Sequence, residues 1–208
     1  MTYENPYINS STWTELNILE TLRKGNPLII CITNDVVRTF TANGLLAIGA
    51  SPVMSECSED LKDLIVHASA LLINIGTVTP DKVTYYKEAV KLAKAHEVPI
   101  ILDPVGCHSG AYRLSVVLDL IKTDAISLLR GNHSEIKAIY DALNTNHKVN
   151  NSLSGKGVDG EQVEDSAIIT YRLARQINCP VVATGEEDYV SDGTRVFAVP
   201  HGHPKIGR

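Results

Sequence analysis

Along this chain, short and continuous apolar segments alternate with longer amphipathic ones. The apolar segments are rich in β-branched residues and nearly free of polar side chains, as strands buried on both faces are. They are residues 27–32, 70–75, 98–102, 125–129, 180–183 and 195–199. Apolar strands separated by helices predict a mostly parallel sheet with helices on both faces, a three-layer α/β fold.

Capping signals predict where several helices begin and end. Thr12 and Glu15 have capping-box spacing at the start of a helix that Gly25 ends, and Thr79 with Pro80 opens another. Three further helices are expected over residues 36–48, 133–143 and 161–177, with a polar loop at 144–160. The segment 195–199 is expected to pair antiparallel with a strand near Tyr189.

The length and composition favour one domain spanning residues 1–208, without a linker long enough to divide it. Hydrophobic residues make up 44% of the chain, yet no apolar run approaches the roughly 20 residues that cross a bilayer. The polar amino terminus has no signal-peptide pattern, so we expect a cytoplasmic protein. A net charge of -5 argues against nucleic acid or an anionic membrane as the main partner.

The four cysteines lie far apart, with no zinc-ligand spacing, so we expect neither a disulfide nor a zinc site. Cys31 and Cys179 fall in apolar segments and are expected to pack as small hydrophobic residues. Cys107 follows a strand end, where it either packs or lines a site.

Polar residues after the apolar segments form the functional shortlist, because ligands of such sheets bind outside the carboxyl ends of the strands. Asn34 either caps the next helix or faces a ligand. Asp103 suits a magnesium ligand or a base, or else it bonds to turn amides.

Two later strand ends have anion-binding or metal-binding residue types. Arg130 offers a planar set of donors to phosphate, and Thr184 precedes a glycine that lets backbone amides approach an anion. Asn132 and Glu135 form either an outer shell for hydrated magnesium or a capping box. No strand is followed by a P-loop or a dinucleotide fingerprint, which disfavours an NAD enzyme.

Taken together and in order, these segments resemble the hydroxyethylthiazole kinases of the ribokinase-like superfamily. The similarity runs from about residue 27 to 203 and includes distinctive strings at several strand ends. The matching strings are ITNDV (32–36), FTANGLL (40–46), GASPVM (49–54), LINIGT (72–77), ILDPVG (101–106), RGN (130–132) with Glu135, KGVD (156–159) and ATGE (183–186).

The resemblance implies transfer of the γ-phosphoryl group of ATP to the alcohol of 4-methyl-5-(2-hydroxyethyl)thiazole, a step of thiamine salvage. By the family pattern, Met54 and Asn34 contact the thiazole. Arg130 and Thr184 contact ATP, and Asp103 with Glu135 helps to hold Mg²⁺. Family members are homotrimers with sites between subunits, so the same assembly is expected here.

The family pattern also contains a T-G-x-G-C motif after the H-G-H region, whose amides form an anion hole. No such motif occurs in these 208 residues. We therefore expect a carboxyl-terminally truncated chain that lacks helices of the fold and has little or no activity. The alternatives are a kinase for a pyrimidine or pyridoxal alcohol and an inactive remnant that binds nucleotide or thiazole without turnover.

Overall fold

The computed structural model describes residues 15–148 and 165–200. Eight strands form one sheet: β1 (Leu28–Ile32), β2 (Ser51–Met54), β3 (Ala70–Asn74), β4 (Ile100–Asp103), β5 (Ile126–Asn132), β6 (Val181–Thr184), β7 (Asp188–Ser191) and β8 (Val196–Val199). The helices are α1 (Glu15–Gly25), α2 (Arg38–Ile48), α3 (Ser58–Ile65), α4 (Pro80–Ala95), α5 (Ala111–Ile121), α6 (His133–Lys148) and α7 (Ser166–Ile177), with a 3₁₀ turn, η1 (Cys107–Ser109).

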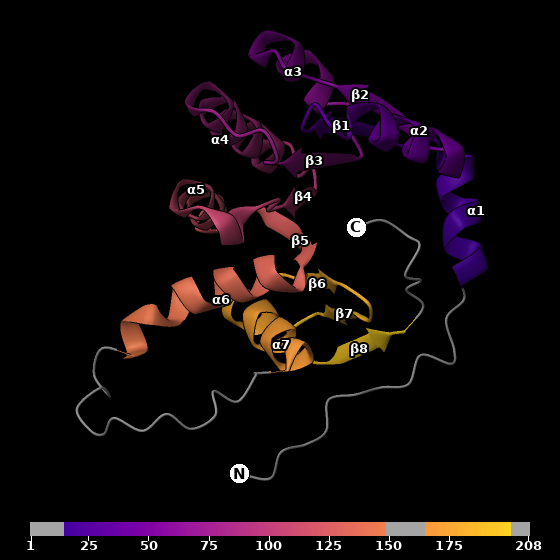
Figure 1. The fold of residues 1–208 in the computed structure, drawn as a ribbon. Coiled ribbons are helices and arrows are strands. Elements are labelled where there is room, and N and C mark those ends of the chain that lie inside the picture. Colours follow the sequence, from indigo (N-terminus) through magenta and orange to yellow (C-terminus); the bar gives the residue numbers. More distant parts are fainter. Residues whose placement is uncertain (1–14, 149–164, 201–208) are drawn as a thin grey trace, which may run out of the picture.

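The sheet has the strand order β2-β1-β3-β4-β5-β6-β7-β8 (Figure 1). Strands β1 to β6 run parallel, whereas β7 is antiparallel to β6 and β8 is antiparallel to β7. The expectation of a mostly parallel α/β sheet is therefore confirmed. The antiparallel pairing near Tyr189 is confirmed too, because Tyr189 lies opposite Ala198.

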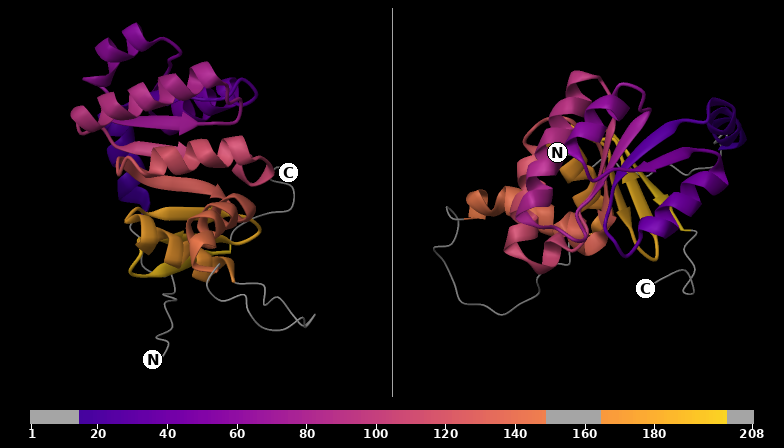
Figure 2. Two further views of the ribbon diagram at one scale, coloured as in Figure 1. Left: turned by 90° about the vertical axis from the view of Figure 1, so that its left-hand side faces the viewer. Right: turned by 90° about the horizontal axis from the view of Figure 1, so that it is seen from above.

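Helices lie on both sides of the sheet, but they cover the two faces unequally. Helices α3 to α7 line one face, and α1 and α2 lie at the other (Figure 2). The first face holds the main core, with Leu71, Leu102 and Leu129 fully buried. The neighbouring side chains Leu72, Ile101 and Leu128, paired in register on the opposite face, are only partly buried.

Helix α4 shows how closely local sequence signals can define an element. The Thr79 side chain accepts a hydrogen bond from the Lys82 amide at 3.2 Å, and Pro80 occupies the first turn, as predicted. Tyr86, Val90 and Ala93 form the expected apolar face and are buried.

Other elements differ from the sequence predictions. Strand β2 and helices α3 and α5 were not expected. Helix α7 begins at Ser166, because the Asp165 side chain caps it through the Ala167 amide at 2.9 Å; residues 161–164 of the expected helix lie outside the described residues. Helix α6 extends to Lys148, into the predicted loop. Thr12, most of that loop and the region from His201 on lie outside the described residues.

Candidate active site

A row of polar side chains crosses the carboxyl ends of four adjacent strands. Asn34 follows β1, Asn74 ends β3, Asp103 ends β4, and Arg130 lies near the end of β5. The sheet register sets the row, because Asn74 pairs directly with Asp103 and the preceding residues of β4 and β5 are paired. Asn34 Nδ2 donates to Asn74 Oδ1 at 2.8 Å, and Asn74 Nδ2 donates to Asp103 Oδ2 at 2.8 Å.

Asn34 is buried, with 5% of its surface exposed, and it orders the turn that follows β1. Its Oδ1 accepts hydrogen bonds from the amides of Val36 at 2.9 Å and Val37 at 3.1 Å. Helix α2 begins only at Arg38 and has no side-chain cap. The predicted helix-capping role of Asn34 is therefore wrong: an intervening turn separates Asn34 from the helix, and the asparagine bonds to that turn instead.

Asp103 has one carboxylate oxygen with hydrogen-bonding capacity to spare. Its Oδ2 accepts from Asn74 and lies 3.6 Å from Arg130 Nη1. Its Oδ1 is buried and has no hydrogen-bond partner among the described residues. Burial raises the pKa of Asp103 to about 6, and the negative charge of Glu135 adds to this, against the opposing effects of Arg130 and the Asn74 hydrogen bond. A cation or a bound proton would satisfy this carboxylate.

Glu135 ties the start of α6 to the turn after β4. Its Oε2 accepts from the Asn132 amide at 2.8 Å, and Asn132 Oδ1 accepts from the Glu135 amide at 2.9 Å. This reciprocal pair is a capping box, one of the two interpretations that the sequence allowed. Glu135 Oε1 accepts from the Gly106 amide at 2.8 Å, which fixes the turn beside Asp103.

The donor set can be tested against the magnesium ion that the family pattern implies. Mg²⁺ is usually held by one or two carboxylates together with waters and substrate phosphates. The unpartnered Asp103 Oδ1 fits that requirement. Each Glu135 oxygen already accepts one amide hydrogen bond but keeps further acceptor capacity. The described residues contain no group of three or more His, Cys, Asp or Glu side chains that would bind a metal without substrate.

Thr184 ends β6 beside Asn132 of β5 and donates through Oγ1 to the Gly131 carbonyl at 3.3 Å. A Cβ atom at the next residue, Gly185, would lie 2.6 Å from the His133 ring, so only glycine fits without a shift. The strand end and the start of α6 are therefore in close contact.

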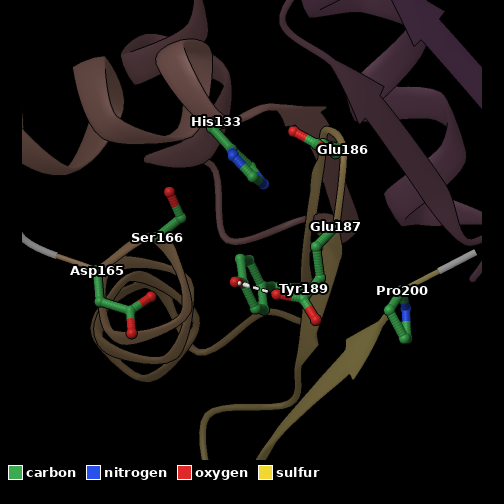
Figure 3. A pocket seen from close by; sticks show the side chains of 7 residues that line it. All are labelled: His133, Asp165, Ser166, Glu186, Glu187, Tyr189 and Pro200. Carbon is green, nitrogen blue, oxygen red and sulfur yellow. Dashed lines mark hydrogen bonds between the residues drawn. The ribbon is translucent and has the colours of Figure 1, made fainter. Parts of the chain in front are cut away.

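A cleft of about 620 Å³ opens beside this contact (Figure 3). The rings of His133 and Tyr189 stack in it with their centroids 5.5 Å apart. Its lining residues are His133, Asp165, Ser166, Glu186, Glu187, Tyr189 and Pro200. Aromatic faces beside carboxylate acceptors suit a flat ring that carries N–H donors.

Met54 ends β2 and pairs in register with Cys31 of β1, so it lies on the Asn34 side of the row. The next residue, Ser55, is buried and lies 2.7 Å from the Tyr85 hydroxyl, oxygen to oxygen. This contact anchors the strand end that holds Met54.

Asn74 was missed by the sequence analysis, although the same rule singles it out. It is a polar residue at the end of an apolar strand, within the string LINIGT. Cys107 proves to be a packing residue: it is buried, and burial raises the pKa of its thiol to about 12. All four cysteines are free.

Among the described residues, no helix is both long enough and apolar enough to pass through a bilayer. The profile of the hydroxyethylthiazole kinase family matches residues 19–208. The chain belongs to the hydroxyethylthiazole kinase family. Since this is a family of kinases, the chain is by descent a phosphotransferase.

Individual relatives agree with this assignment. The chain is 49% identical over 186 residues to hydroxyethylthiazole kinase of Streptococcus agalactiae serotype III (strain NEM316), spanning 89% of this chain and 69% of that protein. It is 43% identical over 191 residues to hydroxyethylthiazole kinase 1 of Streptococcus pneumoniae (strain JJA), spanning 90% of this chain and 70% of the relative.

Solved structures place the family member among the ribokinase-like folds. The hydroxyethylthiazole kinase structure from Pyrococcus horikoshii OT3 superposes with a TM-score of 0.79 at 36% identity, covering 92% of this chain and 68% of that one. Adenosine kinase from Anopheles gambiae gives a TM-score of 0.57 at 11% identity, covering 91% of this chain and 65% of that one, which shows a shared fold alone.

Proposed function

We propose that this hydroxyethylthiazole kinase family member transfers the γ-phosphoryl group of ATP to 4-methyl-5-(2-hydroxyethyl)thiazole, as a cytoplasmic step of thiamine salvage. The alcohol oxygen forms the new bond to the γ-phosphorus, the bond to ADP breaks, and the alcohol proton is released. One observation supports the proposal: the polar row connects Asn34 through Asn74 to Asp103, which lies 3.6 Å from Arg130 and keeps a buried Oδ1 without a partner among the described residues.

Met54 and Asn34 are proposed to contact the thiazole. They end or follow neighbouring strands, since Cys31 of β1 pairs with Met54 of β2. A methionine thioether packs well against a flat aromatic ring. The Asn34 amide, fixed at both its oxygen and its nitrogen, gives a rigid polar neighbour.

Arg130 and Thr184 are proposed to contact ATP. Half of the Arg130 side chain is exposed, so its guanidinium donors remain accessible to phosphate oxygens. The cleft beside Thr184 has room for the rest of a nucleotide, with the His133 and Tyr189 rings as stacking surfaces.

Asp103 and Glu135 are proposed to hold the Mg²⁺ that accompanies ATP. When bound, the ion would neutralise charge on the phosphate oxygens. Asp103 offers its unpartnered Oδ1, and Glu135 keeps the turn that carries Asp103 in place through Gly106. Phosphoryl transfer depends mainly on such positioning and charge neutralisation.

We propose a homotrimer because helix α2 carries apolar side chains, yet none of its residues is buried. Phe40 is 82% exposed and Leu46 is 58% exposed. Exposed apolar surface of this kind marks an interaction surface. Because the family resemblance implies a homotrimer, the partner proposed for this surface is a second copy of the chain.

Binding of nucleotide or thiazole without turnover is the alternative candidate function. Thiazole binding by calorimetry without any phosphorylated product would support this candidate.

A substrate panel tests the primary proposal. The purified chain is incubated with ATP, Mg²⁺ and one alcohol at a time: hydroxyethylthiazole, a pyrimidine alcohol or pyridoxal. We expect ADP release that depends on the thiazole. Release that depends on the pyrimidine alcohol or pyridoxal, and not on the thiazole, would contradict the proposal.

A further inference from the structure

Asn74 lies at the centre of the polar row and is 6% exposed. Its Oδ1 accepts two hydrogen bonds, from Asn34 Nδ2 at 2.8 Å and from the Gly76 amide at 3.0 Å. Its Nδ2 donates to Asp103 Oδ2 at 2.8 Å. Three of the four hydrogen bonds that an asparagine side chain can make are thus formed inside the protein.

These hydrogen bonds allow only one orientation of the Asn74 amide. If the amide were flipped, its oxygen would face the Asp103 carboxylate and its nitrogen would face two N–H donors. The orientation of Asn34 follows from that of Asn74, since Asn34 donates to Asn74 through Nδ2 and accepts turn amides through Oδ1. The hydrogen bonds from Val36 to Asp103 therefore all run in one direction, so that each polarises the next.

The backbone at Gly76 packs directly against the Asn34 side chain. A Cβ atom at Gly76 would lie 2.6 Å from Asn34 Nδ2 and 2.9 Å from its Cγ. The glycine therefore permits the Asn34 amide to lie against the backbone while its nitrogen reaches Asn74.

We propose that Asn74 is a positioning residue for the substrate: anchored by Asp103, it holds the Asn34 amide in the orientation that faces the thiazole. This inference rests on the proposed function, in which Asn34 contacts the thiazole. In this proposal Asn74 does not contact the thiazole, because three of its hydrogen bonds are formed inside the protein, and it affects thiazole binding only through Asn34. Replacing Asn74 should therefore cost nothing further once the Asn34 side chain has been removed.

A double-mutant cycle tests this by calorimetric titration of the full chain with hydroxyethylthiazole, without nucleotide or Mg²⁺. Asn34→Ala and Asn74→Ala are each expected to weaken thiazole binding about tenfold, or about 1.4 kcal/mol. The double variant should bind within about twofold of Asn34→Ala, because both changes remove the same contact. A purely structural role for Asn74 would instead make the losses multiply to about 100-fold.

Gly76→Ala provides a second measurement that leaves the Asn74 side chain in place and does not depend on the folding of Asn74→Ala. The added methyl group displaces the Asn34 amide, so we expect about tenfold weaker thiazole binding. Combined with Asn34→Ala, which removes the two closest atoms and leaves only the Cβ at 3.0 Å, Gly76→Ala should add no more than about twofold. Unchanged binding by Gly76→Ala would contradict the inference.

Ser191→Ala is the matched control. Ser191 is 1% exposed and makes two hydrogen bonds, to the Arg195 carbonyl and from the Gly193 amide. It pairs with Val181, the first residue of β6, so it lies at the amino ends of the parallel strands, away from the polar row at their carboxyl ends. Ser191→Ala should lower the melting temperature yet leave thiazole affinity within about twofold of wild type.

The outcomes separate the inference from the proposed function. If the wild-type chain does not bind the thiazole, the proposed function is contradicted, and the role of Asn74 is contradicted with it. If the wild type binds and Asn34→Ala weakens binding while Asn74→Ala does not, the proposed function stands and the inference alone is overturned. Multiplying losses in the double variant also overturn the inference alone.

Discussion

At the scale of single residues, the most informative group is the Asp103 carboxylate. Its Oδ1 is buried without a partner among the described residues, and its other oxygen is bound to Asn74. A charged carboxylate that is buried away from water, with too few hydrogen bonds to replace its hydration, lowers the stability of the folded state. That cost is expected at a position that must hold a cation when substrate is bound, and it predicts a specific pH dependence.

In magnesium-free buffer, the free energy of unfolding of the wild-type chain should fall as the pH rises from about 4 to about 6. Folding raises the pKa of Asp103 from 3.8 to about 6, so the folded state binds more protons than the unfolded state within this window. At about 1.4 kcal/mol per pH unit, the loss is about 3 kcal/mol.

Asp103→Asn should lack this loss, because the amide does not titrate. Urea unfolding of both proteins across this pH range measures how steeply each free energy of unfolding changes with pH. The other carboxylates contribute equally to both slopes, so the difference between the slopes reports Asp103. Equal slopes for the two proteins would show that Asp103 titrates normally.

Arg130 is expected to affect the nucleotide and not the thiazole. Hydrogen bonds to charged groups contribute about 1.5–3 kcal/mol, so Arg130→Ala should weaken ADP binding at least tenfold. Arg130→Lys should recover only part of this, because an ammonium cannot bind phosphate in a bidentate manner. Calorimetry with ADP and separately with thiazole checks both, and unchanged ADP affinity in Arg130→Ala would refute the assignment.

At the scale of elements, the sequence predicted those whose signals are local and strong, such as the capped helix α4 and the apolar strands β1 and β3. It missed β2 because Pro52 interrupts the strand pattern. Proline is tolerated there because β2 is an edge strand, whose free side needs no hydrogen-bond donor. It missed α3 because only Leu61 and Ile65 of that short helix are buried.

Helix α6 and the turn after β4 should depend on Glu135. Glu135→Ala leaves the amides of Asn132 and Gly106 without their acceptor, so we expect the free energy of unfolding to fall by about 2–4 kcal/mol. The control is Asp119→Ala, which removes an exposed ion pair with Lys87 and should cost at most about 1 kcal/mol. Urea unfolding that gives equal losses for the two variants would contradict the role of Glu135.

At the scale of the whole molecule, the sequence predicted the sheet edge at which polar groups gather, but not how they connect. Asn34 and Asp103 were singled out as strand ends, yet the Asn74 side chain that joins them was not. Residue types alone do not give the strand order, and only the order β1-β3-β4 brings these three side chains into contact. Arg130 was expected after β5 and lies within it.

The exposed side of α2 predicts self-association. Burying a Phe side chain contributes about 1.5–3 kcal/mol, and a charge at its place would have to be desolvated. Phe40→Glu should therefore shift the chain to a monomer, whereas Tyr112→Glu, at a residue 50% exposed on α5, should not. Light scattering after size-exclusion chromatography measures both masses, and a monomeric wild type would contradict the prediction.

The residues of the polar row are proposed to hold a thiazole alcohol against the γ-phosphoryl group of ATP. Mass spectrometry of the reaction mixture tests this proposal, with the wild-type chain and Asp103→Ala incubated with hydroxyethylthiazole, ATP and Mg²⁺. We expect phosphorylated hydroxyethylthiazole and ADP in equal amounts from the wild type. Asp103→Ala should give at least 100-fold less, because losing electrostatic stabilisation of a transferring group costs roughly 10²–10³ in rate. Equal product from both proteins, or thiazole-independent ATP consumption alone, would contradict it.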